Sequence, residues 1–186
     1  MMEKKRRKRG ENSYLNDFHL NLAGEYIYDG ELYACQADPD TQKMQKRKLW
    51  FYTALMLLTA LASGSIPAPG MLGSSYVILP FLGELIAIFS VVWAVCKLGR
   101  DWNAVREYVY ERTLPALPGR ALCVAAFAAA GILCELLYVI LSGHGGQLFY
   151  AFLFVILKVI SLICALTIRR KLKSLNWAKV PKCENQ

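Results

Sequence analysis

Four long apolar segments dominate the sequence, and they restrict the folds that the chain can adopt. They cover residues 49–66, 76–98, 121–141 and 148–168. A helix needs roughly 20 apolar residues to cross a bilayer core about 30 Å thick, and these segments reach or approach that length. Because backbone polar groups in lipid must be satisfied within the segment, each segment is predicted to be a helix. The expected fold class is all-α, a polytopic membrane protein with a four-transmembrane-helix antiparallel bundle.

The composition agrees with a membrane protein and excludes several soluble classes. Of the 186 residues, 55% are hydrophobic and only 19% are charged, whereas soluble domains carry about 25% charged residues. A soluble Rossmann enzyme, a secreted disulfide scaffold and a disordered tail are therefore excluded. The net charge of +8 would suit a nucleic-acid partner. However, the basic residues flank the apolar segments, so we expect no nucleic acid and a lipid bilayer as the partner.

The distribution of Lys and Arg predicts how the chain is threaded through the membrane. Basic residues are concentrated before the first segment, between the second and third, and after the fourth, whereas the connections at 67–75 and 142–147 contain none. Because Lys and Arg accumulate on the cytoplasmic side, both termini are expected to be cytoplasmic. The predicted organisation is a basic N-terminal segment (1–48), a membrane domain (49–168) with a cytoplasmic loop (99–120), and a basic cytoplasmic tail (169–186).

The N-terminal basic run is expected to orient the chain and to contact lipid. It is followed by polar residues, not by an apolar stretch, so no cleaved signal is expected. The expected location is a cytoplasmic (plasma) membrane, and a prokaryotic source is favoured over a eukaryotic one. Because the run lies near the bilayer, it is expected to bind anionic lipid headgroups. Its residues are Lys4, Lys5, Arg6, Arg7, Lys8 and Arg9.

Three charged residues interrupt the apolar segments: Glu84, Glu135 and Lys158. Charges in a bilayer are costly, and by default they mark a site or a partner. At about 1.5 Å per helical residue, all three could lie in one layer in the outer half of the bundle. Glu135 and Lys158 each lie on a helical stripe of small and polar residues, which is typical of helix contacts in lipid. Pro80, one turn before Glu84, is expected to kink its helix.

Three interpretations of this intramembrane ionisable cluster are open. The favoured one is a Lys–Glu pair that holds the bundle in register. A second is a charge that pairs with another subunit. A third is a proton or ion site, because two acids share one base and one acid is left over.

The cysteines and histidines predict no catalytic or metal site. No cysteine lies in an outer connection, where disulfides would form, and no CxxC pair exists. The six cysteines are therefore interpreted as small packing residues. His19 and His144 fall on opposite sides of the membrane, so they cannot share a metal ion, and His144 has no Asp on its side for a triad. No cofactor is expected, because no nucleotide, protease or metal motif is present.

The cytoplasmic segments contain two similar aromatic stretches. Residues 25–33 alternate around an Asp-Gly pair, which predicts a short β-hairpin around residues 25–35. Residues 107–111 (Glu-Tyr-Val-Tyr-Glu) repeat the core of that stretch. Duplication of a two-helix unit would explain the similarity, but chance resemblance between juxtamembrane segments is preferred.

The loop before the third apolar segment is expected to lie on the membrane surface. Residues 101–113 fit a short amphipathic helix, with Trp102, Val105 and Val109 toward lipid. A strand is the competing interpretation, and the helix is preferred.

Two functions from different classes follow, and neither is enzymatic. The first is a non-catalytic accessory or assembly subunit that acts through helix–helix contacts with itself or with another membrane protein. It rests on the lack of catalytic motifs and on the Ala/Gly stripe at residues 125–131. The alternative is a small proton- or ion-coupled transporter, working as an oligomer through Glu84, Glu135 and Lys158. An intramembrane enzyme is the weakest hypothesis, because no nucleophile–base pair shares a depth.

Overall fold

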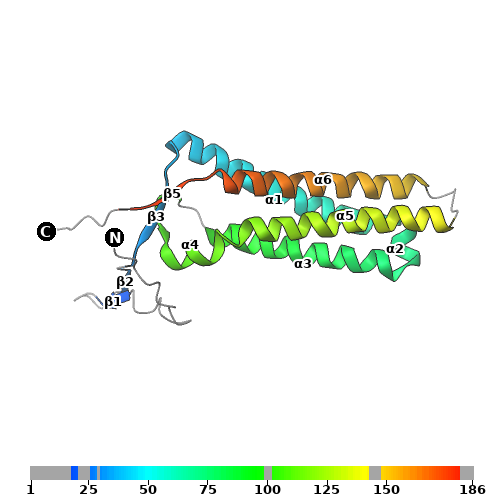
Figure 1. Cartoon of the computed structure of the whole chain (residues 1–186), viewed down its shortest axis with the longest axis horizontal. Helices are drawn as coiled ribbons and strands as arrows, with labels where there is room; N and C mark the ends of the chain where they lie inside the picture. Colours follow the sequence, from blue (N-terminus) through cyan, green and yellow to red (C-terminus); the bar gives the residue numbers. More distant parts are fainter. Residues whose placement is uncertain (1–17, 21–25, 29, 99–101, 143–147, 181–186) are drawn as a thin grey trace, which may run out of the picture.

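Four long helices lie side by side along one axis in the computed structural model (Figure 1). The structure describes residues 18–20, 26–28, 30–98, 102–142 and 148–180. The long helices are α1 (Pro39–Ser65), α3 (Ser75–Leu98), α5 (Leu117–Ser142) and α6 (Leu148–Lys173). Two short helices lie at opposite ends of this bundle: α2 (Pro69–Gly73) and α4 (Glu107–Thr113).

The long helices pack as a square. α5 packs against α3 and α6, and α1 packs against α6 and α3. As a result, α3 and α6 occupy opposite corners, and so do α1 and α5. The core between them is built from inward-facing residues at three-to-four spacing, such as Ile88, Val91 and Val95 on α3, which are almost completely buried.

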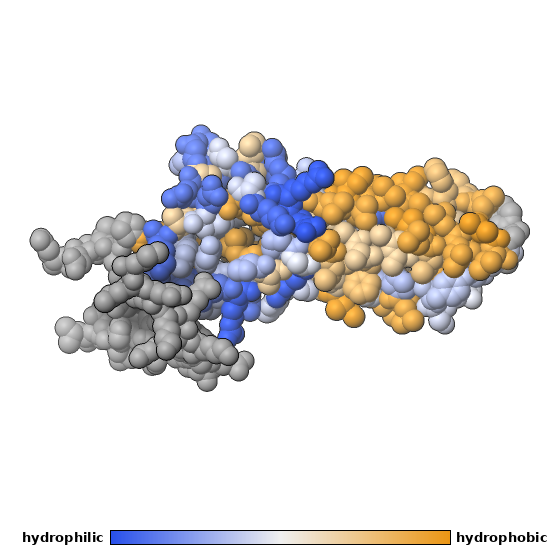
Figure 2. Space-filling view, viewed as in Figure 1, coloured by the Kyte–Doolittle hydropathy of each residue, from blue (hydrophilic) through white to orange (hydrophobic). Residues whose placement is uncertain are grey.

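Among the residues that the structure describes, three helical stretches are long and apolar enough to cross a membrane: α3, α6, and the stretch Glu107–Ser142 that contains α5. The outer surface of the bundle carries many exposed large apolar side chains, for example Ile86 at 72% and Ile140 at 77% exposure. Such a continuous apolar surface is unfavourable in water and favourable in lipid. Figure 2 shows this apolar surface over the part of the bundle that lies away from the strands. Hydrophilic side chains gather at the other end, beside the strands. The prediction of a mostly helical chain is thus confirmed, and the three apolar helices are compatible with a multi-pass membrane protein.

The first predicted segment, residues 49–66, forms the second part of a longer helix, α1. α1 begins at Pro39, ten residues before the apolar segment 49–66, because Pro at the first helical position and the polar residues that follow it are compatible with a helix. The apolar part of α1 lies within the bundle, with Met56 and Ala60 buried.

One end of the bundle carries a small three-stranded sheet, an addition to the all-α class that was predicted. β3 (Leu32–Cys35) is its central strand, and it pairs antiparallel with β4 (Val105–Arg106) and β5 (Trp177–Lys179). The sheet therefore joins three segments that are remote in sequence: the chain before α1, the α3–α5 connection and the chain after α6. We call this end of the bundle the sheet end and the opposite one the α2 end.

The strands around residues 25–35 pair differently from the β-hairpin that was expected there. β2 (Tyr26–Tyr28) pairs antiparallel with β1 (Phe18–Leu20), whereas β3 belongs to the other sheet. The Asp-Gly pair therefore separates two sheets. The Asp-Gly pair does not determine the pairing of β3, because β4 and β5 form hydrogen bonds with the two edges of that strand.

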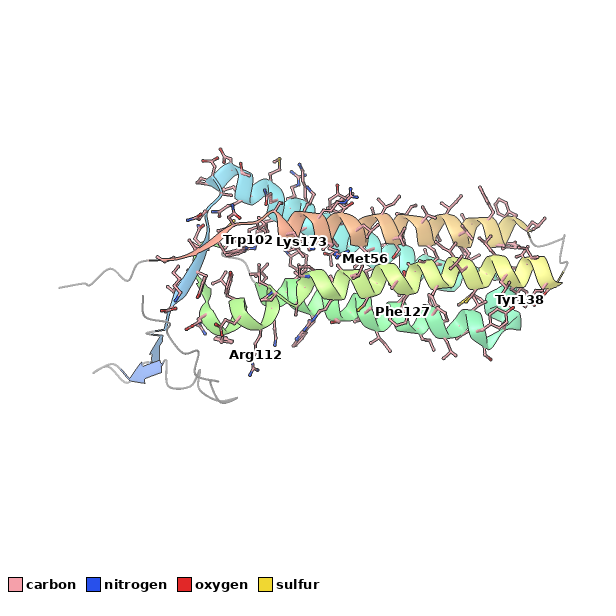
Figure 3. All side chains as sticks on the ribbon, viewed as in Figure 1. Met56, Trp102, Arg112, Phe127, Tyr138 and Lys173 are labelled. Carbon is pink, nitrogen blue, oxygen red and sulfur yellow. The ribbon has the colours of Figure 1, made fainter. Side chains whose placement is uncertain are left out.

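The loop at residues 101–113 also differs from the lipid-facing helix that was predicted. It forms β4 followed by α4, so the strand interpretation is correct for Val105–Arg106 and the helix interpretation for Glu107–Thr113. Trp102 and Val105 are each only 4% exposed, so they face the protein core and not lipid. Trp102 lies between the strands and the bundle (Figure 3), and its carbonyl accepts the backbone N–H of Cys35. The similar stretches at 26–28 and 107–111 are strand and helix respectively.

Candidate functional site

The centre of the bundle contains a closed polar cluster formed by Glu84, Lys158 and Ser161. The ammonium group of Lys158 donates to Glu84 Oε2 and forms an ion pair with it. The Ser161 hydroxyl donates to Glu84 Oε1 over 2.7 Å. All three residues are completely buried. Both carboxylate oxygens thus accept a hydrogen bond, which is the condition for placing a charge away from water.

Helical spacing explains why Lys158 and Ser161 act together. They lie three residues apart on α6, so both side chains face the interior with Phe154. The ammonium nitrogen of Lys158 lies 4.4 Å from the ring centroid of Phe81 and 5.1 Å from that of Phe154. These rings add cation–π attraction to the ion pair.

Small residues on α5 make space for this cluster. Gly131 is buried, and a Cβ added there would lie 3.9 Å from Lys158 Cε, at ordinary contact distance. Ala128, one turn earlier, is also buried. The long Lys158 side chain can therefore pass α5 and reach Glu84 on α3, at the opposite corner of the square.

Glu135, the third predicted residue, lies apart from this pair. It is completely buried, and its Oε1 accepts the backbone N–H of Gly70 in α2 over 3.2 Å. A Cβ on Gly70 would overlap Glu135 Oε2, so a larger residue there would force the carboxylate to move. Within the described residues, Oε2 of Glu135 has no hydrogen-bond partner. The structure thus joins Glu84 to Lys158 and places Glu135 against α2, instead of bringing all three together.

Pro80 does not end α3, which continues as one helix from Ser75 to Leu98. Proline has no N–H, so it removes one hydrogen bond of the helical ladder in the turn before Glu84.

The sheet end contains an aromatic cluster that the sequence did not predict. The rings of Tyr33 and Tyr110 stack with their centroids 4.0 Å apart and their planes inclined by 4°. The ring centroid of Trp177 lies 6.0 Å from that of Tyr110 and 5.7 Å from that of Trp102. The repeated Tyr residues in the sequence could have indicated this cluster, but the contact between Tyr33 and Tyr110 depends on the pairing of β3 with β4.

Charges around Tyr33 tie β3 to β5. Lys179 forms an ion pair with Glu31, and its ammonium nitrogen lies 5.9 Å from the centroid of the Tyr33 ring. Burial raises the pKa of the Tyr33 phenol, while the positive charge of Lys179 opposes that shift. The hydrogen bond to Glu31 raises the pKa of Lys179.

The cysteines of the described residues are free thiols, of which Cys35 and Cys164 are buried. In the same part of the chain, no group of three or more His, Cys, Asp or Glu side chains could hold a metal ion. Cys183, His144 and the basic run at residues 4–9 lie outside the described residues.

No family model, curated protein or solved structure matches this chain.

Proposed function

We propose that this chain is a multi-pass membrane protein of four crossing helices that acts as a non-catalytic accessory or assembly subunit. The observation that carries the proposal is the closed cluster of Glu84, Lys158 and Ser161. These buried polar groups satisfy one another inside a single chain, so they hold α3 and α6 together without requiring a substrate or a second subunit. This supports the interpretation of the pair as structural, with the apolar outer surface left for contacts.

The character of α1 supports a fourth crossing. Its buried Thr53, Thr59 and Ser63 each donate to a carbonyl of their own helix, at 2.8, 3.0 and 2.8 Å. Hydroxyl groups satisfied in this way need no water and are tolerated in lipid. The outward side of α1 presents large apolar side chains, among them Phe51 and Leu58.

The charge distribution supports cytoplasmic termini. The basic residues of the last turn of α6, which include Arg170 and Lys173, lie at the sheet end, where Figure 2 shows hydrophilic side chains. Lys97 lies in the last turn of α3, at the same end of the bundle. By the positive-inside rule, this end faces the cytoplasm. We further propose that the membrane is a cytoplasmic membrane of a prokaryote, the setting expected from the sequence.

Contacts with another protein would use the outer surface of the bundle. Ala128 and Gly131, part of the stripe that suggested a partner helix, are buried within the bundle, where they let α5 approach its neighbours. The outward positions Leu58 and Leu61 of α1 remain exposed. We propose that apolar positions of this kind contact a second copy or another membrane protein.

Purification in a mild detergent tests this proposal. The mass of the particle and its co-purifying proteins would be determined for the wild-type chain and for Leu58→Ala/Leu61→Ala. We expect the wild-type chain to form a stoichiometric complex, and we expect the double substitution to weaken it. Phe152→Ala/Ile156→Ala, which alters exposed positions on α6, is the matched control. A monomer that remains alone in detergent and in nanodiscs would contradict the proposal.

A second candidate function is a small proton- or ion-coupled transporter. The observation that favours it is Glu135, a buried acid with one oxygen unpartnered within the described residues. Intramembrane acids of this kind serve as proton relays in carriers. Flux measured in liposomes would be lost in Glu135→Gln if the chain is a carrier, while assembly would be unaffected. If the wild-type chain carries no flux, the subunit proposal stands alone.

A further inference from the structure

The sheet end of α3 carries a pocket that neither proposed function uses. The pocket has a volume of about 240 Å³ and lies where α3 ends and β4 and α4 begin. Lys97, Leu98, Arg106, Tyr108 and Val109 are part of its lining. Typical small-molecule sites measure roughly 300–1,000 Å³, so this pocket suits a small group better than a whole metabolite.

The lining combines two cations with a phenol and apolar walls. Lys97 and Arg106 are both exposed, and they come from different elements that meet at the pocket. A guanidinium group can donate two parallel hydrogen bonds to a phosphate, and an ammonium group adds a point charge. Tyr108 contributes a hydroxyl group, while Leu98 and Val109 contribute apolar surface. This combination suits a phosphate that is attached to an apolar body.

The position of the pocket along α3 indicates what kind of molecule carries the phosphate. The exposed apolar side chains of α3 extend from Leu79 through Phe89 to Trp93. Trp93 is 63% exposed, and the ammonium nitrogen of Lys97 lies 5.4 Å from its ring centroid. Exposed tryptophans mark the level of lipid headgroups at the edge of a bilayer. The pocket begins one turn beyond Trp93, which is the level of lipid phosphates.

We propose that this pocket binds the phosphate of an anionic phospholipid, such as phosphatidylglycerol, with the acyl chains lying along the exposed apolar side of α3. A soluble phosphate ester presents the same phosphate, but it has nothing to place against that apolar side. The site is separate from the N-terminal basic run that the sequence indicated for lipid contact. It goes beyond both proposed functions and requires only that α3 crosses a membrane.

The test measures lipid binding by the full chain in detergent, with native mass spectrometry and thermal unfolding as readouts. Phosphatidylglycerol is expected to remain bound and to raise the unfolding temperature, whereas phosphatidylcholine and glycerol 3-phosphate are not. In Lys97→Gln/Arg106→Gln, affinity for phosphatidylglycerol is expected to fall about 30-fold, from about 1 kcal/mol for each basic residue near the headgroups. Stabilisation by glycerol 3-phosphate without lipid would assign the pocket to a soluble phosphate and overturn the lipid proposal.

Two further variants separate a pocket from general surface charge. Arg170→Gln/Lys173→Gln removes two basic residues at the end of α6, at the opposite corner of the bundle from α3, and should bind phosphatidylglycerol normally. Ala104→Trp fills the pocket from an exposed lining position and keeps both cations, and should lose binding. Equal losses in the two double variants, or full binding by Ala104→Trp, would show that no specific pocket is involved. Unfolding in phosphatidylcholine alone checks that each variant is folded.

Discussion

Lys158 donates to Glu84 across the centre of the bundle, between two helices that occupy opposite corners. A pair between neighbouring helices would fix one interface. This diagonal pair instead runs past Gly131 of α5 and draws α3 and α6 toward each other. Apart from Ser161, the other buried residues of α3 and α6 carry no charged or hydroxyl group, so we propose that this pair sets the register of the two helices.

Removal of one partner of this pair is expected to be costly. Lys158→Met leaves the Glu84 carboxylate buried without a base, because the Ser161 hydroxyl can donate a hydrogen bond but no charge. We expect the free energy of unfolding to fall by about 3–5 kcal/mol. The measurement is unfolding of the detergent-solubilised chain, with Arg170→Met, an exposed position, as the control.

Replacement of both partners distinguishes a structural pair from a functional one. Glu84→Met/Lys158→Met removes both charges and fills the space, so most of the lost stability should return. If the single variant unfolds like the wild-type chain, the pair does not hold the bundle together.

Gly70 is expected to tolerate no side chain while Glu135 is present. In Gly70→Ala, the new Cβ would overlap Glu135 Oε2 and lie 3.0 Å from Val77 Cγ2. Overpacking of this kind costs about 1–3 kcal/mol. Glu135→Ala should destabilise the chain by a similar amount, because the buried N–H of Gly70 loses its acceptor.

The double variant tests whether these two residues act on each other. Gly70→Ala/Glu135→Ala should lose less stability than the two single variants together, because the shortened side chain makes room for the Cβ. Gly119→Ala is the matched control, since nothing lies within 4 Å of a Cβ there. Strictly additive effects would contradict direct contact between Gly70 and Glu135.

The apolar parts of α3, α5 and α6 could be predicted from long apolar runs, but α5 begins four residues before the predicted segment and α6 ends five residues after it. A long run of apolar residues, as at residues 76–98, has one stable form in lipid. A Lys–Glu pair was favoured because a buried base requires an acid, but the sequence did not indicate which of Glu84 and Glu135 would pair with Lys158. The role of Gly70 could not be predicted, since a backbone N–H in a five-residue helix leaves no side-chain signal.

The sheet was missed because its strands are too short to show an alternating pattern. β4 has two residues and β5 has three. Their partners lie far away in the sequence, so pairing depends on how the helices bring the segments together. Once β3 is placed between them, the burial of Trp102 follows, and the lipid-facing orientation predicted for it is excluded.

Tyr33 is expected to ionise at higher pH than an unperturbed tyrosine. Its pKa is raised above 10.0 by burial, despite the nearby charge of Lys179. Because the folded pKa is the higher one, the folded state binds the phenolic proton more tightly than the unfolded state does. The associated stability is complete below about pH 10 and is lost as the pH rises through the folded value. Ultraviolet absorbance of the wild-type chain and of Tyr33→Phe would give the midpoint by difference.

A substitution at Lys179 tests the cause of this shift. Lys179→Met removes the charge that opposes the effect of burial, so the pKa of Tyr33 should rise further. A midpoint at or below the usual value in the wild-type chain would contradict the burial of this ring.

With the four crossings that we propose, α2 would lie outside the cell and the start of α1 inside it. Leu72 in α2 is 73% exposed, and Lys43 in the polar first part of α1 is also exposed. In a background without the native cysteines, Leu72→Cys should react with a membrane-impermeant maleimide on intact cells. Lys43→Cys should react only after the membrane is made permeable. The contrast arises because α1 would carry the chain across the bilayer between these two positions, with the basic residues retained inside.

Labelling at a third position separates a chain with four crossings from one with three. Ser174→Cys follows α6 and is exposed, so with four crossings it should behave like Lys43→Cys. If α1 lay on the membrane surface instead of crossing it, positions 43 and 72 would share one side, and position 174 would lie on the other, because α3, α5 and α6 alone carry the chain across three times. Each arrangement therefore gives its own pattern of labelling at the three positions, and only the pattern in which position 72 alone is outside agrees with four crossings and cytoplasmic termini.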